Sequence, residues 1–199
     1  MNIAIIPARG GSRRIPRKNI KPFHGKPIIA YSIETAKASG LFAEVCVSTD
    51  DEEIAEVAAD YGAIVLARPA YLAEDDIGTQ EVMKYAIQQA ETLISESFDY
   101  ACCAYPTAPM MTVDGLKWGF CEVVNRSDIA YSFSVGCNPL QDAGQFYWGR
   151  IEAFLYDKPL IWPNVAMIPI QDNRVCDINY PDDWLRAERM YADLHREVA

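Results

Sequence analysis

The residues best suited to chemistry lie in a basic, glycine-containing segment close to the amino terminus, residues 8–19 (ARGGSRRIPRKN). Its two adjacent glycines let backbone N–H groups approach phosphate oxygens, because no Cβ stands in the way. A hydroxyl and several cationic side chains follow, and together they can neutralise a triphosphate from several sides. We therefore predict a phosphate cradle. Its candidate residues are Ala8, Arg9, Gly10, Gly11, Ser12, Arg13 and Lys18.

Two widespread phosphate-binding patterns do not fit this segment. It matches neither G-x-x-x-x-G-K-[ST] nor G-x-G-x-x-G, which excludes the Walker and dinucleotide-binding interpretations. The structural alternative to a phosphate cradle is a solvated basic loop built around a Gly-Gly turn.

The distribution of charge favours the cradle. The chain has 18 Lys and Arg against 28 Asp and Glu, a net charge of -10, which argues against a general nucleic-acid or anionic-membrane surface. Residues 1–33 nevertheless contain seven Lys or Arg and no acid, so the other 166 residues carry 11 minus 28, or -17. An acidic protein that concentrates its cations in this way is expected to bind a compact, highly charged anion there.

A second candidate site lies near the carboxyl terminus, in residues 175–179 (VCDIN). In a strand, the side chains of Asp177 and Asn179 project to the same face. Two oxygen-bearing side chains placed in this way can share a Mg²⁺ ion that also bridges phosphate oxygens. The structural alternative is that both residues cap the turn before Pro181.

An alternation of strands and helices must position these segments. Residues 2–7 are a short apolar run that opens into the basic segment, as expected of a buried strand followed by a loop. Asp50 with Glu53, and later Thr79, are the expected helix caps. This rhythm predicts an α/β fold with a mostly parallel sheet and ligands at the carboxyl ends of the strands. We expect strands at 2–7, 44–48, 63–66, 100–105 and 129–135, helices at 27–40, 51–62, 79–93, 113–125 and 181–198, and short strands within 143–149, 160–170 and 173–178.

Composition limits the remaining possibilities. The 199 residues are half apolar, which suffices for a single domain over residues 1–199 whose core needs no metal or disulfide. The six cysteines include no C-x-x-C pair and there are only two histidines, so we expect reduced thiols and no zinc site. No apolar run reaches the ~20 residues of a membrane span and no signal peptide is recognisable, so we expect a cytoplasmic location without a membrane partner.

Several segments together resemble a known family. In the order in which they occur, they are similar to the cytidylyltransferases that activate nine-carbon acidic sugars, the CMP-sialic acid synthetase-like family. The likeness spans nearly the whole chain, and RIPRKN with DAGQFYWG favours pseudaminic acid as the sugar. The segments are IAIIPARGGSRRIPRKNI at 3–20, GKP at 25–27, VSTDDEEIAEVA at 47–58, RPAYL at 68–72, DAGQFYWG at 142–149 and DINYPDDW at 177–184.

The resemblance implies a Rossmann-like, three-layer fold of the nucleotide-diphosphosugar transferase type. It also implies an enzyme that binds CTP and a divalent metal, joins CMP to the anomeric hydroxyl of the sugar and releases pyrophosphate. Arg9, Ser12 and Lys18 fall in the family's phosphate-binding loop, with Asn19 beside them. Arg13 stands where the pattern usually has Lys, which keeps the charge but replaces a compact ammonium with a planar fork.

Two further segments take roles from the resemblance. The segment that closes over the cytosine corresponds to Arg68 and the loop that follows it. In the metal motif the pattern has two Asp residues, whereas here the second is Asn179, which offers a carbonyl oxygen but no negative charge beside Asp177. The residues of the cytosine segment are Arg68, Asp76, Gly78 and Thr79.

Residues 142–148 (DAGQFYW) are expected to contact the sugar. Strand alternation directs Gln145 and Tyr147 to one side and their apolar neighbours to the other, so one face is polar enough to hydrogen-bond sugar hydroxyls. An ordinary amphipathic strand is the structural alternative. Tyr105 either faces the sugar or packs on the edge of the sheet. The candidate sugar-binding residues are Tyr105, Asp142, Gln145 and Tyr147.

The chain departs from the family pattern before residue 142. The family has a long arm between the fifth strand and DAGQFYWG, which reaches a partner subunit and helps to bind the sugar. Here only CNPLQ, residues 137–141, separates them. Because the arm is shortened near 136–142, a homodimer is left open and CTP binding is the firmer expectation.

We interpret the chain as a nucleotidyltransferase that transfers CMP from CTP to a nonulosonic acid, with Mg²⁺ as cofactor and pseudaminic acid as the expected acceptor. Arg9, Arg13 and Lys18 would stabilise charge on the β and γ phosphates, while Mg²⁺ on Asp177 screens the α-phosphate. A metal-bound water and Asp177 itself are both left open as the general base. The alternatives are sialic or legionaminic acid as acceptor, a catalytically silent CTP-binding homologue, and a structural subunit whose basic loop docks an acidic partner.

Overall fold

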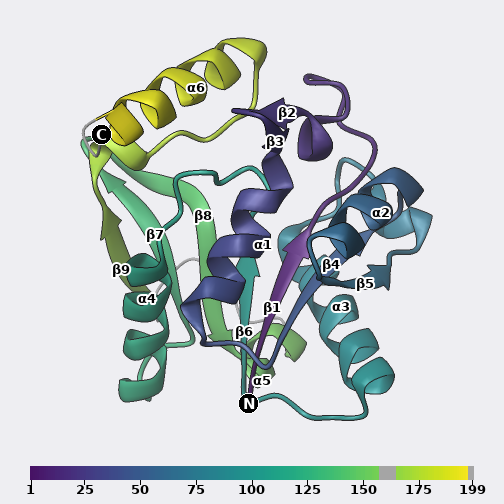
Figure 1. Cartoon of the computed structure of the whole chain (residues 1–199). Coiled ribbons are helices and arrows are strands. Elements are labelled where there is room, and N and C mark those ends of the chain that lie inside the picture. Colours follow the sequence, from purple (N-terminus) through teal and green to yellow (C-terminus); the bar gives the residue numbers. More distant parts are fainter. Residues whose placement is uncertain (157–164, 197–199) are drawn as a thin grey trace.

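A seven-stranded sheet forms the centre of the computed structural model, which describes residues 1–156 and 165–196 (Figure 1). The strand order is β5-β4-β1-β6-β8-β7-β9, and β8 is the one strand of this described sheet that runs antiparallel to its neighbours. The predicted α/β Rossmann-like architecture with a mostly parallel sheet is confirmed. The strands are β1 (Asn2–Pro7), β4 (Glu44–Thr49), β5 (Ile64–Ala67), β6 (Tyr100–Ala104), β7 (Tyr131–Cys137), β8 (Leu140–Arg150) and β9 (Val165–Ile170).

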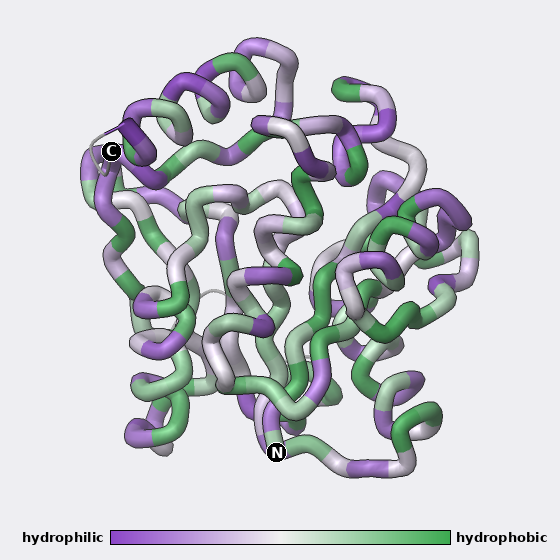
Figure 2. The backbone as a smooth tube through the Cα atoms, viewed as in Figure 1, coloured by the Kyte–Doolittle hydropathy of each residue, from purple (hydrophilic) through white to green (hydrophobic). Residues whose placement is uncertain are grey.

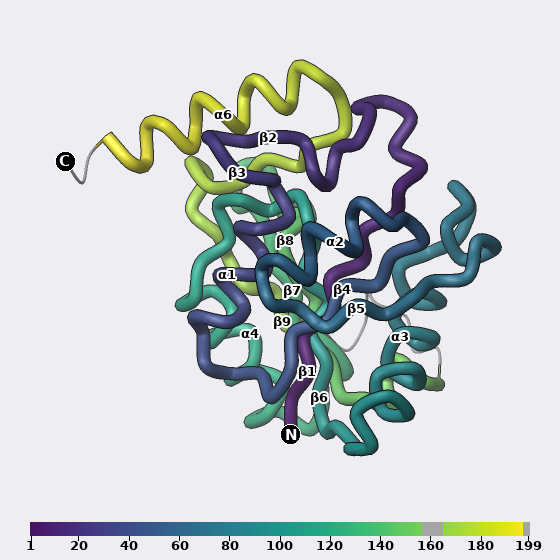
Figure 3. Tube along the Cα trace, turned by 45° about the vertical axis from the view of Figure 1, so that its right-hand side comes forward, coloured from purple at the N-terminus to yellow at the C-terminus, as the bar shows by residue number. Residues whose placement is uncertain are grey.

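Helices cover both faces of the sheet. Helices α1 (Ile28–Ser39), α2 (Glu52–Asp60) and α4 (Val113–Asn125) pack on one face, while α3 (Thr79–Ile94) and α5 (Ile151–Leu155) pack on the other. Helix α6 and a small hairpin lie above the carboxyl edge of the parallel strands (Figure 1, Figure 3). The remaining elements are β2 (Pro22–Phe23), β3 (Lys26–Pro27), α6 (Pro181–Arg196) and the 3-10 turns η1 (Lys18–Ile20), η2 (Ala70–Ala73) and η3 (Asp172–Arg174).

The alternation of side chains along β1 explains why the sheet is buried on both faces. Ile3 and Ile5 pack with α3, whereas Ala4 and Ile6 pack with α1 and α2, and all four are fully buried. Figure 2 shows hydrophobic residues along β1 and β4, while α6 is largely hydrophilic. A strand buried on both faces is rigid, so the loop that follows β1 starts from a fixed point.

Helix α6 is fixed over the carboxyl edge by an aromatic cluster. Trp184 is 2% exposed, its ring lies edge-on 5.5 Å from that of Phe23, and the Lys21 ammonium lies 4.2 Å above it. The same cluster buries Ile178, which stands between Asp177 and Asn179. The packing of α6 therefore holds the predicted metal motif against the hairpin that follows the basic segment.

Replacing Trp184 with alanine is expected to lower the free energy of unfolding by about 3–5 kcal/mol, because a large, buried ring is lost and the site collapses only partly. Chemical denaturation of the two proteins measures this difference. Leu185→Ala is the matched control, since Leu185 is 54% exposed, and its cost is expected to stay below about 1 kcal/mol. Equal losses in the two variants would contradict the role given to the cluster.

Two of the predicted helix caps were wrong by one residue. Asp51, not Asp50, caps α2, accepting a hydrogen bond from the Ile54 N–H at 3.0 Å. Gly78, not Thr79, is the N-cap of α3, and Thr79 is the first residue of the helix. The Glu81 carboxylate accepts a hydrogen bond from the Gly78 N–H at 2.8 Å and closes this end of the helix. The Asp50 and Thr79 side chains form other hydrogen bonds, with the Gly10 N–H and the Tyr105 hydroxyl respectively.

The strand predicted at 173–178 was also wrong. This stretch contains the end of η3 and then extended chain outside the sheet, since β9 already takes the edge position beside β7. It is held instead by Gln145, whose Nε2 donates to the Arg174 carbonyl at 2.9 Å. The predicted segments 160–164 and 197–198 lie outside the described residues. Within the part of the chain that is described, no helix has both the length and the apolar character needed to cross a membrane.

Candidate active site

A pocket of about 410 Å³ opens at the carboxyl end of β1, between the basic segment and the turn that follows β6. Four of its lining residues are Arg or Lys from the basic segment, so the structure gathers these cations around one concavity, in which the Arg13 side chain is still 84% exposed. The lining residues are Pro7, Arg9, Ser12, Arg13, Arg14, Lys18, Asn19, Asp75, Tyr105, Pro106, Thr107 and Asn179.

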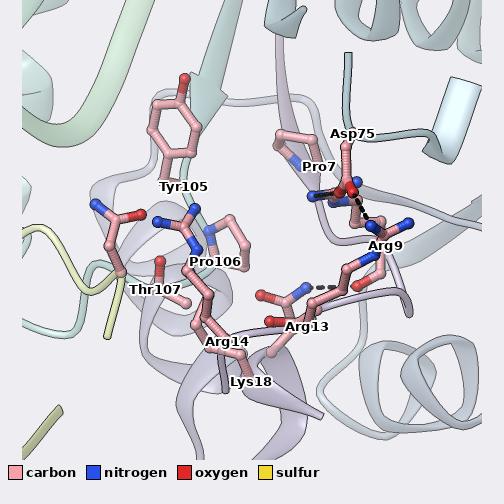
Figure 4. Close-up of a pocket in the computed structure, with 12 residues that line it drawn as sticks. Pro7, Arg9, Arg13, Arg14, Lys18, Asp75, Tyr105, Pro106 and Thr107 are labelled. Atoms are coloured by element: carbon pink, nitrogen blue, oxygen red, sulfur yellow. Dashed lines mark hydrogen bonds and ion pairs between the residues drawn. The ribbon is translucent and has the colours of Figure 1, made fainter. Parts of the chain in front are cut away.

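Two arginines of the pocket share one carboxylate (Figure 4). Arg9 Nη2 lies 2.6 Å from Asp75 Oδ1, and Arg13 Nη1 lies 3.1 Å from Asp75 Oδ2. Arg9 also donates from Nη1 to the Ala73 carbonyl at 3.0 Å. The hydrogen bond from Arg9 and the neighbouring positive charges hold the pKa of the Asp75 carboxyl below its ordinary value. The sequence had pointed to Asp76, which is exposed and does not line the pocket.

The first glycine of the basic segment is fixed against the end of β4. The Gly10 N–H donates to Asp50 Oδ1 at 2.9 Å, which is the role that Asp50 takes in place of capping α2. A Cβ on Gly10 would lie 2.5 Å from Asp51 Oδ2, so a larger residue would force these elements apart. A Cβ on Gly11, in contrast, would have no atom within 4 Å. Only the first glycine is required by close packing.

The rest of the loop backbone is anchored by short polar contacts. Ala8 is buried and its N–H donates to the Ser48 carbonyl at 2.9 Å, which extends the β1–β4 ladder by one bond. Asn19, 5% exposed, donates from Nδ2 to the Arg9 carbonyl at 2.9 Å. Ser12 is half-buried and lines the pocket. Asn19 therefore fixes the backbone from which Arg9 projects.

Lys18 links the basic segment to the predicted metal motif. Its Nζ donates to the Ile178 carbonyl at 2.7 Å, across 160 positions of sequence. Burial lowers the pKa of the Lys18 ammonium below its ordinary value, and the nearby Asp177 carboxylate opposes that shift. Segments that are 160 positions apart in the sequence thus meet beside the pocket.

Two other arginines of the segment have separate roles. Arg14, which the sequence analysis did not single out, lines the pocket with its guanidinium carbon 5.0 Å from the centre of the Tyr180 ring. Arg17 lies outside the pocket lining and pairs with Asp51 and Glu53, each at 2.5 Å. The signal for Arg14 was the local density of cations, but only the folded chain separates it from Arg17.

The metal motif places two oxygen-bearing side chains together, although not in a strand. Asn179 Nδ2 donates to Asp177 Oδ2 at 2.5 Å, and Asn179 also lines the pocket. Asp177 Oδ1 accepts no hydrogen bond from the described residues. Among these residues no group of three or more His, Cys, Asp or Glu could enclose a metal ion. A divalent ion at Asp177 would therefore draw its other ligands from substrate phosphates, Asn179 and water, as Mg²⁺ commonly does.

Residues 142–148 lie in β8, and their side chains alternate as predicted. Tyr147 stacks on Phe133 on one side of the sheet at 5.4 Å between ring centres, and it is 4% exposed. Gln145, on the same side, is 3% exposed, and its Oε1 has no hydrogen-bond partner among the described residues. The Tyr147 hydroxyl donates to Asp142, which is exposed. Gln145 and Tyr147 are thus buried supports rather than pocket-lining groups.

Tyr105 is the one predicted sugar-binding residue that lines the pocket. Its ring lies 6.0 Å from that of Tyr147, and its hydroxyl is 2.9 Å from Thr79 Oγ1. Burial raises the pKa of the Tyr105 hydroxyl well above its ordinary value, so it stays protonated. In Figure 4 this hydroxyl points away from Arg14 and Lys18. The Tyr105 hydroxyl is therefore engaged with Thr79 rather than directed at these cations.

The four residues predicted for the cytosine segment lie beside the pocket without lining it, although Asp75 of the same loop does line it. Arg68 is 7% exposed and forms two hydrogen bonds with Ser48. Its Nε donates to the Ser48 hydroxyl at 3.2 Å, and its Nη2 donates to the Ser48 carbonyl at 2.7 Å. Burial lowers the pKa of its guanidinium to about 10. Asp76 and Gly78 are exposed. Arg68 orders the ends of β4 and β5, and contact between this segment and a base stays a prediction.

Comparisons with known proteins show the family of the chain. The model of one family, described as cytidylyltransferase, matches residues 3–118, which include the basic segment and the turn after β6. The chain belongs to the cytidylyltransferase family. The predicted family and enzyme class, a nucleotidyltransferase, are confirmed. This cytidylyltransferase is 36% identical to the pseudaminic acid cytidylyltransferase of Campylobacter jejuni over 230 aligned positions, which cover 99% of each chain.

Solved structures show the same fold as this cytidylyltransferase. That of a CMP:2-keto-3-deoxy-manno-octonic acid synthetase complexed with CTP matches with a TM-score of 0.77 and 14% identity, covering 97% of this chain and 99% of that one. A manganese complex of a Mycobacterium tuberculosis protein matches with a TM-score of 0.64 and 11% identity, covering 94% and 97%. At these identities the likeness concerns the fold alone.

The length of the alignment bears on the prediction that this cytidylyltransferase has a shortened arm. Because 230 aligned positions contain a chain of 199 residues, at least 31 positions of the Campylobacter protein have no counterpart here. In the structure β7 passes directly into β8 through the turn at Asn138 and Pro139, with Cys137 opposite Leu140. The place predicted for the shortening is therefore a tight hairpin.

Proposed function

We propose that this cytidylyltransferase transfers CMP from CTP to pseudaminic acid and releases pyrophosphate. The observation that carries the proposal is the pocket at the end of β1, where Arg9, Arg13, Arg14 and Lys18 surround a space large enough for a nucleotide tail. The similarity along the whole chain to a pseudaminic acid cytidylyltransferase supports the choice of acceptor.

The reaction fits the positive charge that lines the pocket. The anomeric hydroxyl of the sugar would attack the α-phosphorus and lose its proton to a metal-bound water or to Asp177, and the bond from that phosphorus to the bridging oxygen breaks as pyrophosphate leaves with the electron pair. Arg9, Arg13 and Lys18, which line the pocket, would stabilise the charge that collects on the leaving group. Tyr105 lines the same pocket and would face the sugar, while Asp177, hydrogen-bonded to the pocket-lining Asn179, would face the α-phosphate.

We propose a divalent cation, Mg²⁺, at Asp177 and Asn179. Their chemistry fits, since one carboxylate oxygen is unengaged within the described chain and the Asn179 carbonyl oxygen can join it when the amide rotates. When bound, such an ion would neutralise charge on the α-phosphate. Lys18 links this motif to the basic segment through its hydrogen bond to the Ile178 carbonyl.

The function is tested by incubating the protein with CTP, Mg²⁺ and one acid at a time, and by measuring pyrophosphate and the CMP-sugar. We expect release with pseudaminic acid and at least about tenfold lower kcat/KM with sialic or legionaminic acid, since a lost polar contact commonly costs this much. Faster turnover of another acid would correct the acceptor. Nucleotide binding without release from any of these acids would show a silent homologue and contradict the proposal.

Replacing Asn179 with aspartate is expected to lower the Mg²⁺ concentration needed for half-maximal activity by about three- to tenfold, because a second carboxylate adds negative charge to the motif. A Mg²⁺ titration of initial rates measures this. Asn173→Asp, on the exposed turn η3, adds the same charge outside the pocket and serves as the control. Equal metal requirements in all three proteins would argue against the assigned site.

A further inference from the structure

Asp75 holds the two arginines that the proposed reaction needs for phosphate. Its two oxygens lie 2.6 Å from Arg9 and 3.1 Å from Arg13, and both guanidinium groups line the same pocket. A carboxylate that bridges two guanidinium groups makes the same kind of charge-assisted contact as a phosphate with two of its oxygens. These contacts and phosphate contacts cannot be made by the same nitrogen atoms at once.

The segment that carries Asp75 is anchored on both sides of this residue, and the residues between the anchors are exposed. It is anchored before the acid by Leu72, which is 7% exposed, and after it by the contacts of Gly78 with Glu81. Between the anchors, Glu74, Asp75 and Asp76 are exposed. Movement of the acidic stretch would therefore break the two ion pairs and the Arg9 bond to the Ala73 carbonyl, without unpacking the residues on either side.

We propose that Asp75 competes with the phosphates of the nucleotide for Arg9 and Arg13, so that the nucleotide binds by displacing it. The inference rests on the proposed function, because it assigns these arginines to the triphosphate. The intramolecular contact lowers the apparent affinity for every polyanion, and a full triphosphate gains the most by engaging both arginines. A ligand with a single phosphate displaces Asp75 less effectively. The contact thus favours nucleoside triphosphates over monophosphates, including a CMP product.

The probe that tests this is inorganic tripolyphosphate, which has no base or sugar. Calorimetric titration of Asp75→Asn is expected to show about three- to tenfold tighter binding than the parent protein, since two partly exposed ion pairs are removed. Asp75→Ala is also expected to bind tripolyphosphate more tightly than the parent protein. The matched control is Asp76→Asn, which makes the same change in net charge one position away and outside the pocket, and its affinity should stay within about twofold.

The outcomes separate the inference from the proposed function. If tripolyphosphate binds all proteins equally, or if the Asp75 and Asp76 variants tighten alike, Asp75 does not compete and the inference is overturned while the phosphate pocket stands. Weaker binding by both Asp75 variants would show that Asp75 positions the arginines, which also overturns it. If tripolyphosphate binds none of the proteins, the pocket is not a phosphate site and the proposed function fails with the inference.

Discussion

Replacing Arg9 with alanine is expected to lower kcat/KM for CTP by about a hundredfold or more. Arg9 lines the pocket, and the hydrogen bond from Asn19 to the Arg9 carbonyl fixes the backbone from which the guanidinium would reach phosphate once Asp75 is displaced. The loss of one preorganised charge that faces the leaving group typically costs about 10²–10³ in rate. Steady-state kinetics over a range of CTP concentrations measure the effect.

The control for Arg9 is Arg126→Ala. Arg126 follows α4 and pairs with Glu122 and Asp128 outside the pocket, and exposed pairs of this kind contribute about 1 kcal/mol or less. This variant should keep nearly the parent rate, and both variants should unfold close to the parent protein. A parallel loss of stability and CTP turnover in Arg9→Ala would mean that Arg9 supports the fold rather than the nucleotide.

Replacing Asp177 with asparagine is expected to lower kcat by about a hundredfold or more while nucleotide binding without metal changes little. Asp177 provides the one carboxylate of the metal motif, and its Oδ1 is unengaged within the described chain. A cation at this point would stabilise charge on the α-phosphate by several kcal/mol, which is the size of the effect expected. Initial rates at increasing Mg²⁺ and CTP calorimetry in chelator separate the two properties.

Asp172→Asn gives the comparison for Asp177. Asp172 begins η3, is exposed, and precedes the motif without lining the pocket. Its variant is expected to keep the parent rate and metal requirement. If Asp177→Asn retains full activity at low Mg²⁺, the ion is held by other groups and the motif has the structural role of capping the turn before α6.

The basic segment and the sheet could be predicted from the sequence because both are local patterns. A buried strand followed by two glycines and a run of cations fixes where a polyanion would meet β1, wherever the other elements lie. Charge density also locates the pocket wall. It does not distinguish Arg14, which lines the pocket, from Arg17, which pairs with Asp51 and Glu53, since these contacts join residues more than thirty positions apart.

The acidic partners were harder to assign. Asp75 and Asp76 are adjacent and chemically identical, so only the path of the chain between η2 and α3 decides which one reaches Arg9. Asp50 and Asp51 differ in the same way, and the one-residue difference decides whether a carboxylate caps α2 or binds Gly10. Alternation along β8 was predictable, but the burial of Gln145 depends on the chain that crosses it near Arg174.

The most direct test of the account is a crystal structure of the protein grown with CTP and Mg²⁺. We predict that the β and γ phosphates lie within hydrogen-bond distance of Arg9, Arg13 and Lys18, with the α-phosphate directed toward Asp177. A triphosphate bound elsewhere, with these cations turned to solvent or still closed on protein carboxylates, would contradict the central claim.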